Sequence, residues 1–111
     1  MAEPDFAIGQ FATGPNLEET LIDPDGGVAD LTGSTIEFRM SPRDESFPAI
    51  VKVGTSVGDP TTGVALVAWV TGDLDVYGWY NFQWIVTRAN GQVVPYPAEG
   101  YRTLLVQRRL V

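Results

Sequence analysis

The chain contains no cysteine and no histidine. Without cysteine there is neither a disulfide framework nor a thiolate metal site, so the fold must be stabilised by packing. Without histidine the commonest general base and metal ligand are both absent. Asp73 and Asp75 are the only close carboxylate pair beside aromatic residues, and neighbours in one turn rarely present the opposed acid and base of glycoside hydrolysis. We therefore expect no enzymatic activity, no catalytic residue, no cofactor and no metal site.

Basic residues are scarce, with seven against fourteen acidic ones and a net charge of −7. Apart from Arg108 and Arg109 they are scattered, whereas a nucleic-acid-binding surface needs clustered positive charge. Long hydrophobic runs are also absent, and the first residues lack the basic and apolar regions of a signal peptide. We expect a soluble protein that carries no secretion signal of its own and has neither nucleic acid nor membrane as a partner.

The length of 111 residues predicts one domain, residues 1–111, that buries about 65% of its unfolded surface. Twelve glycines and eight prolines interrupt the chain so often that no stretch of helical length stays intact. The composition and the frequent glycine and proline breaks predict an all-β domain. Residues 1–14 form either an N-terminal arm or a first edge strand, because Phe6 and Ile8 alternate before Gly9 interrupts.

Two apolar runs flank a turn at residues 72–78 and organise the chain. The second run has a period of two, which predicts a strand with one core-facing row: Tyr80, Phe82, Trp84 and Val86. In the first run, residues 63–70, both alternating rows are apolar, so this strand is either central or covered. We expect Trp69, Phe82 and Trp84 to share one core.

Shorter patterns predict the other strands. Their ranges are 17–22, 34–40, 49–53, the edge pair Val93–Val94, and the closing strand 101–111. Residues 41–48 are polar and bounded by prolines, which predicts a loop, and residues 54–63 read as a turn-rich connector. Counted together, these patterns give about seven strands at the spacing typical of a β-sandwich.

The turn before the second apolar run has a further pattern. The spacing of Asp75, Gly78 and Tyr80, with Phe82 two residues on, resembles the tyrosine corner of immunoglobulin-like sandwiches. Glycine supplies a backbone conformation that other residues resist, and the tyrosine can hydrogen-bond back across the corner. The alternative is an ordinary hairpin between two aromatic strands. The expected fold is an immunoglobulin-like β-sandwich of about seven strands.

A second turn, at residues 23–27, contains two aspartates and invites a calcium interpretation. The loop is short and lacks a glutamate at the distance expected for a bidentate ligand. We therefore expect a solvated turn.

The order of these motifs resembles that of a known family, the immunoglobulin-like domains of tailed-phage virion proteins. Within that family the chain is similar to the N-terminal domain of the baseplate upper protein. The resemblance rests on these elements in sequence: Gly14-Pro15, residues 21–26 (LIDPDG), residues 30–33 (DLTG) before a strand ending in residues 38–40 (FRM), a strand ending in Trp69, the corner, a Tyr-Pro pair, and Gly100-Tyr101. It implies a structural module of the virion, assembled in the host cytoplasm, that docks onto a tail, baseplate or capsid. The implied partners are other virion proteins and further copies of the chain. No fibre segment follows, which favours a free-standing or decorating subunit.

Candidate contact residues come from the outward apolar row of the first run, from the outward side of the second run and from the chain ends. They are Phe6, Phe11, Val64, Leu66, Trp79, Arg108 and Arg109. A second interpretation is a carbohydrate-binding or cell-surface adhesion module in which Trp79 and Tyr77 stack on sugar rings. A third is that Trp79 simply covers the corner.

Overall fold

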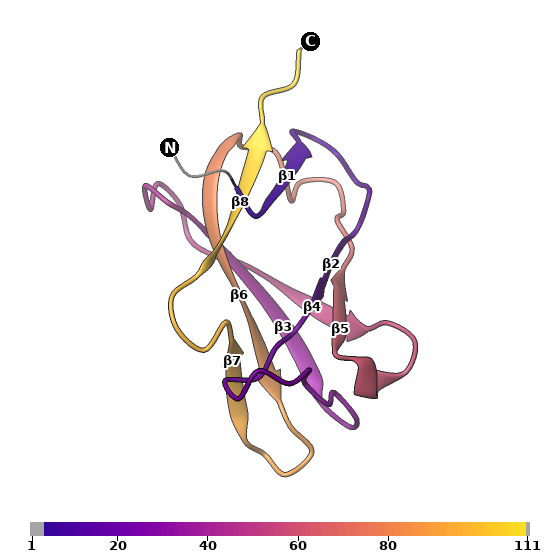
Figure 1. Ribbon diagram of the computed structural model, residues 1–111. Helices are drawn as coiled ribbons and strands as arrows, with labels where there is room; N and C mark the ends of the chain where they lie inside the picture. Colours follow the sequence, from indigo (N-terminus) through magenta and orange to yellow (C-terminus); the bar gives the residue numbers. More distant parts are fainter. Residues whose placement is uncertain (1–3, 111) are drawn as a thin grey trace.

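The structure is a computed structural model that describes residues 4–110 (Figure 1). These residues form an all-β fold with one short 3-10 turn, which confirms the expected class. The elements are β1 (Phe6–Gly9), β2 (Leu17–Thr20), β3 (Thr35–Pro42), β4 (Ile50–Ser56), η1 (Pro60–Thr62), β5 (Val64–Val67), β6 (Gly78–Thr87), β7 (Val93–Tyr96) and β8 (Arg102–Gln107). No helix within residues 4–110 has the length and apolarity to cross a membrane.

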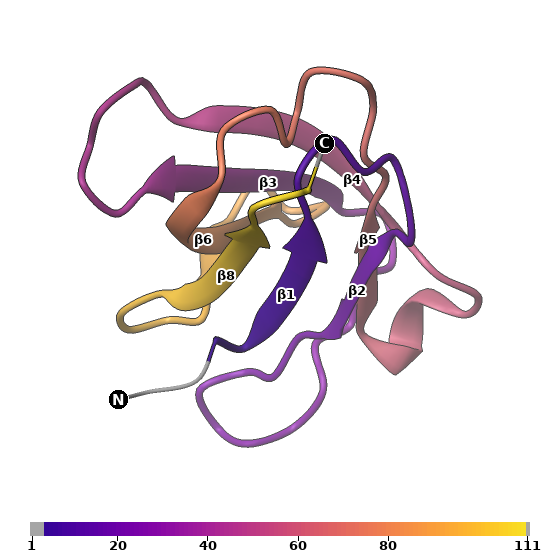
Figure 2. The ribbon, with the colours of Figure 1, turned by 90° about the horizontal axis from the view of Figure 1, so that it is seen from above.

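The strands form a curled mixed sheet in the order β1-β8-β6-β3-β4-β5-β2, and β7 pairs with β6 off this path. The β1–β8 pair is parallel, and the other pairs are antiparallel. Viewed from above, the curl brings the two edge strands, β1 and β2, to face each other (Figure 2). The segment expected as an arm or edge strand therefore runs as an edge strand over Phe6–Gly9.

Strand β6 lies at the centre of the fold. One side pairs with β3, and the other pairs with β8 and then with β7. Its predicted inward row, Tyr80, Phe82, Trp84 and Val86, is at most 1% exposed. The ring of Phe38 packs against Trp69, Phe82 and Trp84, with centroid distances of 5.7, 5.2 and 4.9 Å. The prediction that Trp69, Phe82 and Trp84 share one core is confirmed.

The first apolar run contains β5, which lies between β4 and β2. This central position explains why both of its rows are apolar. Ala65 and Val67 are buried, while Val64 and Leu66 on the outward row are half-buried. The strand ends at Val67, earlier than the sequence predicted, yet Trp69 beyond it is still only 3% exposed.

Two segments that the sequence predicted as a loop and a connector begin as strand instead. Strand β3 continues to Pro42, inside the predicted loop, and β4 continues to Ser56, inside the predicted connector. The reason for the second error is Gly54, at which β4 changes partner from β3 to β5. A Cβ atom there would lie 2.9 Å from Ile36 Cγ2 and 3.2 Å from Trp84 Cζ3. Glycine thus continues the strand because it allows close approach to the core, although it reads locally as a turn signal.

Substitution of Gly54 tests this contact. We expect Gly54→Ala to lower the free energy of unfolding by about 1–3 kcal/mol, because the added methyl group overlaps buried side chains. Gly9→Ala is the matched control, since a Cβ there meets nothing within 4 Å. Urea denaturation followed by tryptophan fluorescence measures both, and equal midpoints for the two variants would contradict the assignment.

Candidate functional site

The corner predicted at the start of β6 is held by a backward hydrogen bond. The Tyr80 hydroxyl donates to the carbonyl oxygen of Val76 at 2.6 Å. Gly78, between them, has a φ of 134°, in the region that favours glycine. The Asp75 carbonyl accepts a hydrogen bond from Gln10 Nε2 at 2.8 Å. The geometry is that of a tyrosine corner, in which the tyrosine hydroxyl bonds to the backbone a few residues upstream.

The loop leading into the corner is fixed to the rest of the molecule. Asp73 Oδ2 accepts from Lys52 Nζ at 2.6 Å and from the Val70 backbone N–H at 2.7 Å. The ion pair is only 14% exposed on each side, so it is poorly screened by solvent. The Leu74 side chain is buried in the core, and its carbonyl accepts from the Phe11 N–H at 2.9 Å. Asp73, considered with Asp75 as a carboxylate pair, is therefore engaged in holding this loop on β4.

Two aromatic rings beside the corner each have an arginine over one face. The Arg43 guanidinium lies 4.9 Å from the Trp79 ring, and the Arg108 guanidinium lies 5.5 Å from the Tyr77 ring. Trp79 is half-buried, and its carbonyl also accepts from the Arg43 N–H. Each pair combines ring packing with a cation–π attraction. The sequence reasoning missed Arg43, because nothing local links the 41–48 segment to the start of β6.

We call the end of the molecule that contains the corner the corner end. It comprises the loops at residues 10–16, 43–49 and 68–77, the first residues of β6 (78–80) and residues 108–110, at the top of Figure 1. Exposed large apolar side chains gather there: Phe11, Val70, Val76, Tyr77 and Leu110. The neighbouring carboxylates are Asp44, Glu45 and Asp75. This end therefore presents apolar, aromatic and charged groups together.

The corner end also holds the cations that form no ion pair with another described residue. Of the seven basic residues, Arg39, Lys52, Arg88 and Arg102 each pair with a carboxylate. The remaining three, Arg43, Arg108 and Arg109, make no ion pair within residues 4–110. All three lie at the corner end.

The structure divides the predicted contact residues into two groups. Phe11, Trp79, Arg108 and Arg109 come together at the corner end, and the Arg109 N–H donates to Gln10 Oε1 at 3.2 Å. The other three lie elsewhere. Phe6 is half-buried, with its ring centroid 5.7 Å from that of Phe82. Val64 and Leu66 lie on β5 opposite Thr20 and Glu18 of β2.

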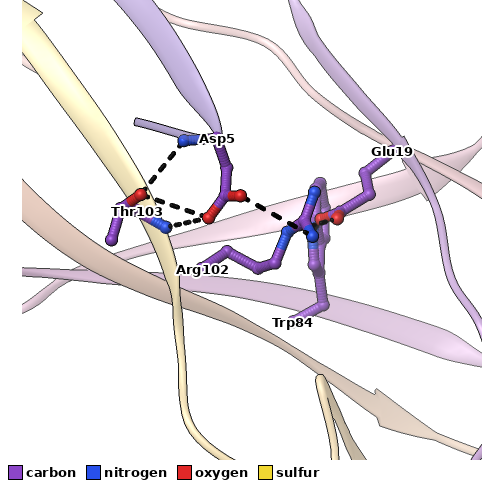
Figure 3. Close-up of polar contacts among 5 residues, drawn as sticks. All are labelled: Asp5, Glu19, Trp84, Arg102 and Thr103. Atoms are coloured by element: carbon purple, nitrogen blue, oxygen red, sulfur yellow. Dashed lines mark hydrogen bonds and ion pairs between the residues drawn. The ribbon is translucent and has the colours of Figure 1, made fainter. Parts of the chain in front are cut away.

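A second polar cluster joins strands from opposite edges of the sheet (Figure 3). Glu19 of β2 accepts from Trp84 Nε1 at 2.8 Å, and its other oxygen lies 2.8 Å from Arg102 Nε of β8. Asp5, just before β1, lies 3.8 Å from Arg102 Nη1 and accepts from the Thr103 N–H at 2.8 Å. We call this cluster the clasp. Glu19 was not singled out from the sequence. The only sign of its burial was its place on the same alternating row as the inward-facing Leu17 and Leu21.

Burial of the clasp affects the ionisation of Glu19. Removal from solvent raises the pKa of this carboxyl above 4.5, and the Trp84 hydrogen bond and the Arg102 charge oppose the rise. The side chain is 13% exposed. Ionised Glu19 therefore depends on Trp84 and Arg102 for its stabilisation.

The turn considered for calcium is used in internal contacts instead. Asp23 accepts from the Tyr96 hydroxyl at 2.6 Å and lies 3.3 Å from Arg88 Nη2. Asp25 accepts from the Gly27 N–H. Burial is the main cause that raises the pKa of the Tyr96 hydroxyl. Across residues 4–110, no three carboxylates converge on a point that could hold a metal ion.

The corner bond predicts a measurable effect on stability. Tyr80→Phe keeps the ring in the core but removes the donor to Val76, so we expect the free energy of unfolding to fall by about 1 kcal/mol. Tyr101→Phe is the control, because Tyr101 is 66% exposed. Urea denaturation compares the two variants. A Tyr80→Phe midpoint equal to that of Tyr101→Phe would show that the hydrogen bond from Tyr80 to Val76 does not stabilise the fold.

The clasp predicts a pH dependence. Because the pKa of Glu19 is raised in the folded state, the folded chain binds more protons than the unfolded chain just above pH 4.5. The contribution of Glu19 to stability therefore falls as the pH rises through that window. Glu19→Gln removes the ionisable carboxyl and with it this pH-dependent contribution. The free energy of unfolding of the variant relative to wild type should therefore rise from pH 4.5 upward and then level off.

Urea denaturation at several values between about pH 4 and pH 7 measures this difference. Glu18→Gln, on the exposed row of the same strand, controls for the loss of one negative charge. A Glu19→Gln difference that is flat with pH, or that falls as the pH rises, would contradict the prediction.

No protein-family model, curated protein or solved structure matches this chain. The functional argument therefore depends on the residues and contacts described above.

Proposed function

We propose that this chain is a structural protein of a phage virion, an immunoglobulin-like β-sandwich module that docks onto a tail, baseplate or capsid through protein–protein contacts. Three features support the sandwich: the parallel β1–β8 pair beside β6 and β3, the β2–β5 pair that joins the rest of the sheet only through the end of β4, and the tyrosine corner. The order of sequence motifs supports the virion assignment. Other virion proteins, and further copies of this chain, are the partners.

The observation that carries the docking role is the composition of the corner end. Aromatic and arginine side chains are enriched at the centres of protein interfaces, where a few of them supply most of the binding energy. Tyr77 is 52% exposed, and the stacked Arg108 makes no ion pair within residues 4–110. Stacking holds each arginine in a limited set of conformations, which lowers the entropy lost on binding. A partner that offers carboxylates around an apolar centre fits this surface.

The same contacts favour protein over sugar as the ligand. A sugar ring that stacked on Trp79 or Tyr77 would compete with the arginine already over that ring. Because Lys52 and a backbone amide occupy Asp73, the carboxylate pair of the turn is also poorly suited to hydrolysis. A non-enzymatic docking role accounts for both observations.

Co-sedimentation of the purified protein with tail, baseplate and capsid fractions tests this function. We expect wild type to bind one of these fractions, and Tyr77→Ala and Arg108→Glu each to weaken binding by about tenfold or more, as expected for interface hot spots. Val53→Ser is the matched control, because Val53 is 84% exposed on β4, outside the corner end.

Three results would overturn parts of the proposal. Loss of binding with Leu66→Glu but not with the corner-end variants would place docking on the outward row of β5. No binding to any particle fraction would remove the virion role. Retention on a polysaccharide column that is lost with Trp79→Ala would establish the carbohydrate-binding alternative instead.

A further inference from the structure

The two edge strands of the sheet face each other without pairing. Within residues 4–110, β1 pairs only with β8 and β2 pairs only with β5. Figure 2 shows β1 and β2 side by side across a space that no strand bridges. We call the surface between them the seam. An unpaired strand edge presents backbone donors and acceptors that another extended chain can use.

The free edge of β2 can be assigned from its ladder. The Leu21 N–H donates to the Gly63 carbonyl at 2.8 Å, which places these residues as a hydrogen-bonded pair. Bonded and non-bonded pairs alternate in an antiparallel ladder, so the backbone groups of Glu19 also face β5. The N–H and C=O groups of Glu18 and Thr20 therefore point away from β5, into the seam.

The seam has one hollow at the start of β2 and another towards its end. A hollow of about 270 Å³ lies between β1 and the start of β2, and its apolar lining includes Phe6, Ile8, Leu17, Trp69 and Leu104. A larger one, of about 510 Å³, is lined by the clasp residues Glu19 and Arg102 together with Tyr96. Both hollows include Phe6 and Glu18 in their linings, so they form one continuous surface along β2.

One of the residues that line the smaller hollow carries an unsatisfied donor. Trp69 lines it and is 3% exposed, and its Nε1 is buried with no hydrogen-bond partner among the described residues. Buried polar groups without partners are rare, because each one is destabilising. A carbonyl oxygen brought in by an added chain would be the acceptor that this nitrogen lacks.

We propose that the seam binds an extended segment of a partner protein, which adds as a strand to the free edge of β2. Its apolar side chains enter the two hollows, and a basic side chain lies beside the exposed Glu18. A second copy fits less well, because two-fold pairing of β2 with β2 would bring the Glu18 side chains of two chains with net charge −7 together. The seam meets the corner end at Pro15, Asn16 and Trp69 but includes neither Tyr77 nor Arg108, so this inference is tested independently of the proposed docking surface.

A synthetic peptide is the probe for this strand addition. It has about seven residues, enough to span β2, with alternating valine and threonine and a central lysine. Hydrogen exchange at the Glu18 and Thr20 amides, followed by NMR, is the readout. We expect fast exchange in the free protein and protection on adding the peptide. The same peptide with alternate backbone amides N-methylated is the control, since it cannot complete a ladder.

Two protein variants test how Glu18 and Trp69 contribute to peptide binding. Glu18→Lys should weaken peptide binding by about threefold through loss of one exposed ion pair. Trp69→Phe keeps an aromatic ring in the hollow but removes the N–H, and should weaken binding by about fivefold. Tyr77→Ala, at the corner end, should bind the peptide as wild type does.

The proposal is overturned if both amides exchange as fast with the peptide at millimolar concentration as without it. Equal protection by the N-methylated peptide would also overturn it. Protection that appears without peptide and grows with protein concentration would identify a second copy as the occupant. Should Trp69→Phe fail to fold, Glu18→Lys on the exposed row still decides the outcome.

Discussion

The structure depends on one side of β6 remaining buried. The strand places Tyr80, Phe82, Trp84 and Val86 in the core and contacts β3, β7 and β8 through its backbone. Because side chains alternate, a register slip of one residue would move this whole row to the other face of the sheet. The same alternation sends Trp79 outward at the corner end. The core and the candidate docking surface are thus set by a single register.

Partly buried polar contacts then fix how the remaining segments sit on this strand. The Lys52–Asp73 pair holds the corner loop, and the clasp links Glu19 of β2 to Trp84 and Arg102. Part of the attraction in such pairs is offset by the cost of removing the charges from water. We infer that their main effect is to select one arrangement of loops and edges, since the buried aromatic cluster supplies most of the apolar contact.

The sequence predicted those features that depend on neighbours along the chain. Alternation identified the inward row of β6, and apolar residues on both faces indicated that β5 is either central or covered. Gly54 was misread because its effect depends on Trp84 and Ile36, which belong to other strands. The positions of Arg43 over Trp79 and of Glu19 beside Arg102 likewise depend on which strands become neighbours in the sheet. Residue periodicity carries no information on that pairing.

The parallel pairing of β1 with β8 has a mechanical consequence. Among the described residues β1 is the first strand along the chain and β8 is the last, and both run in the same direction. A pulling force between the start of β1 and the end of β8 therefore acts along the strands and loads all of their mutual hydrogen bonds at once. Antiparallel terminal strands pulled from a common end would instead separate one bond at a time. The rate of forced unfolding of this domain is thus governed by the shear strength of a single short ladder.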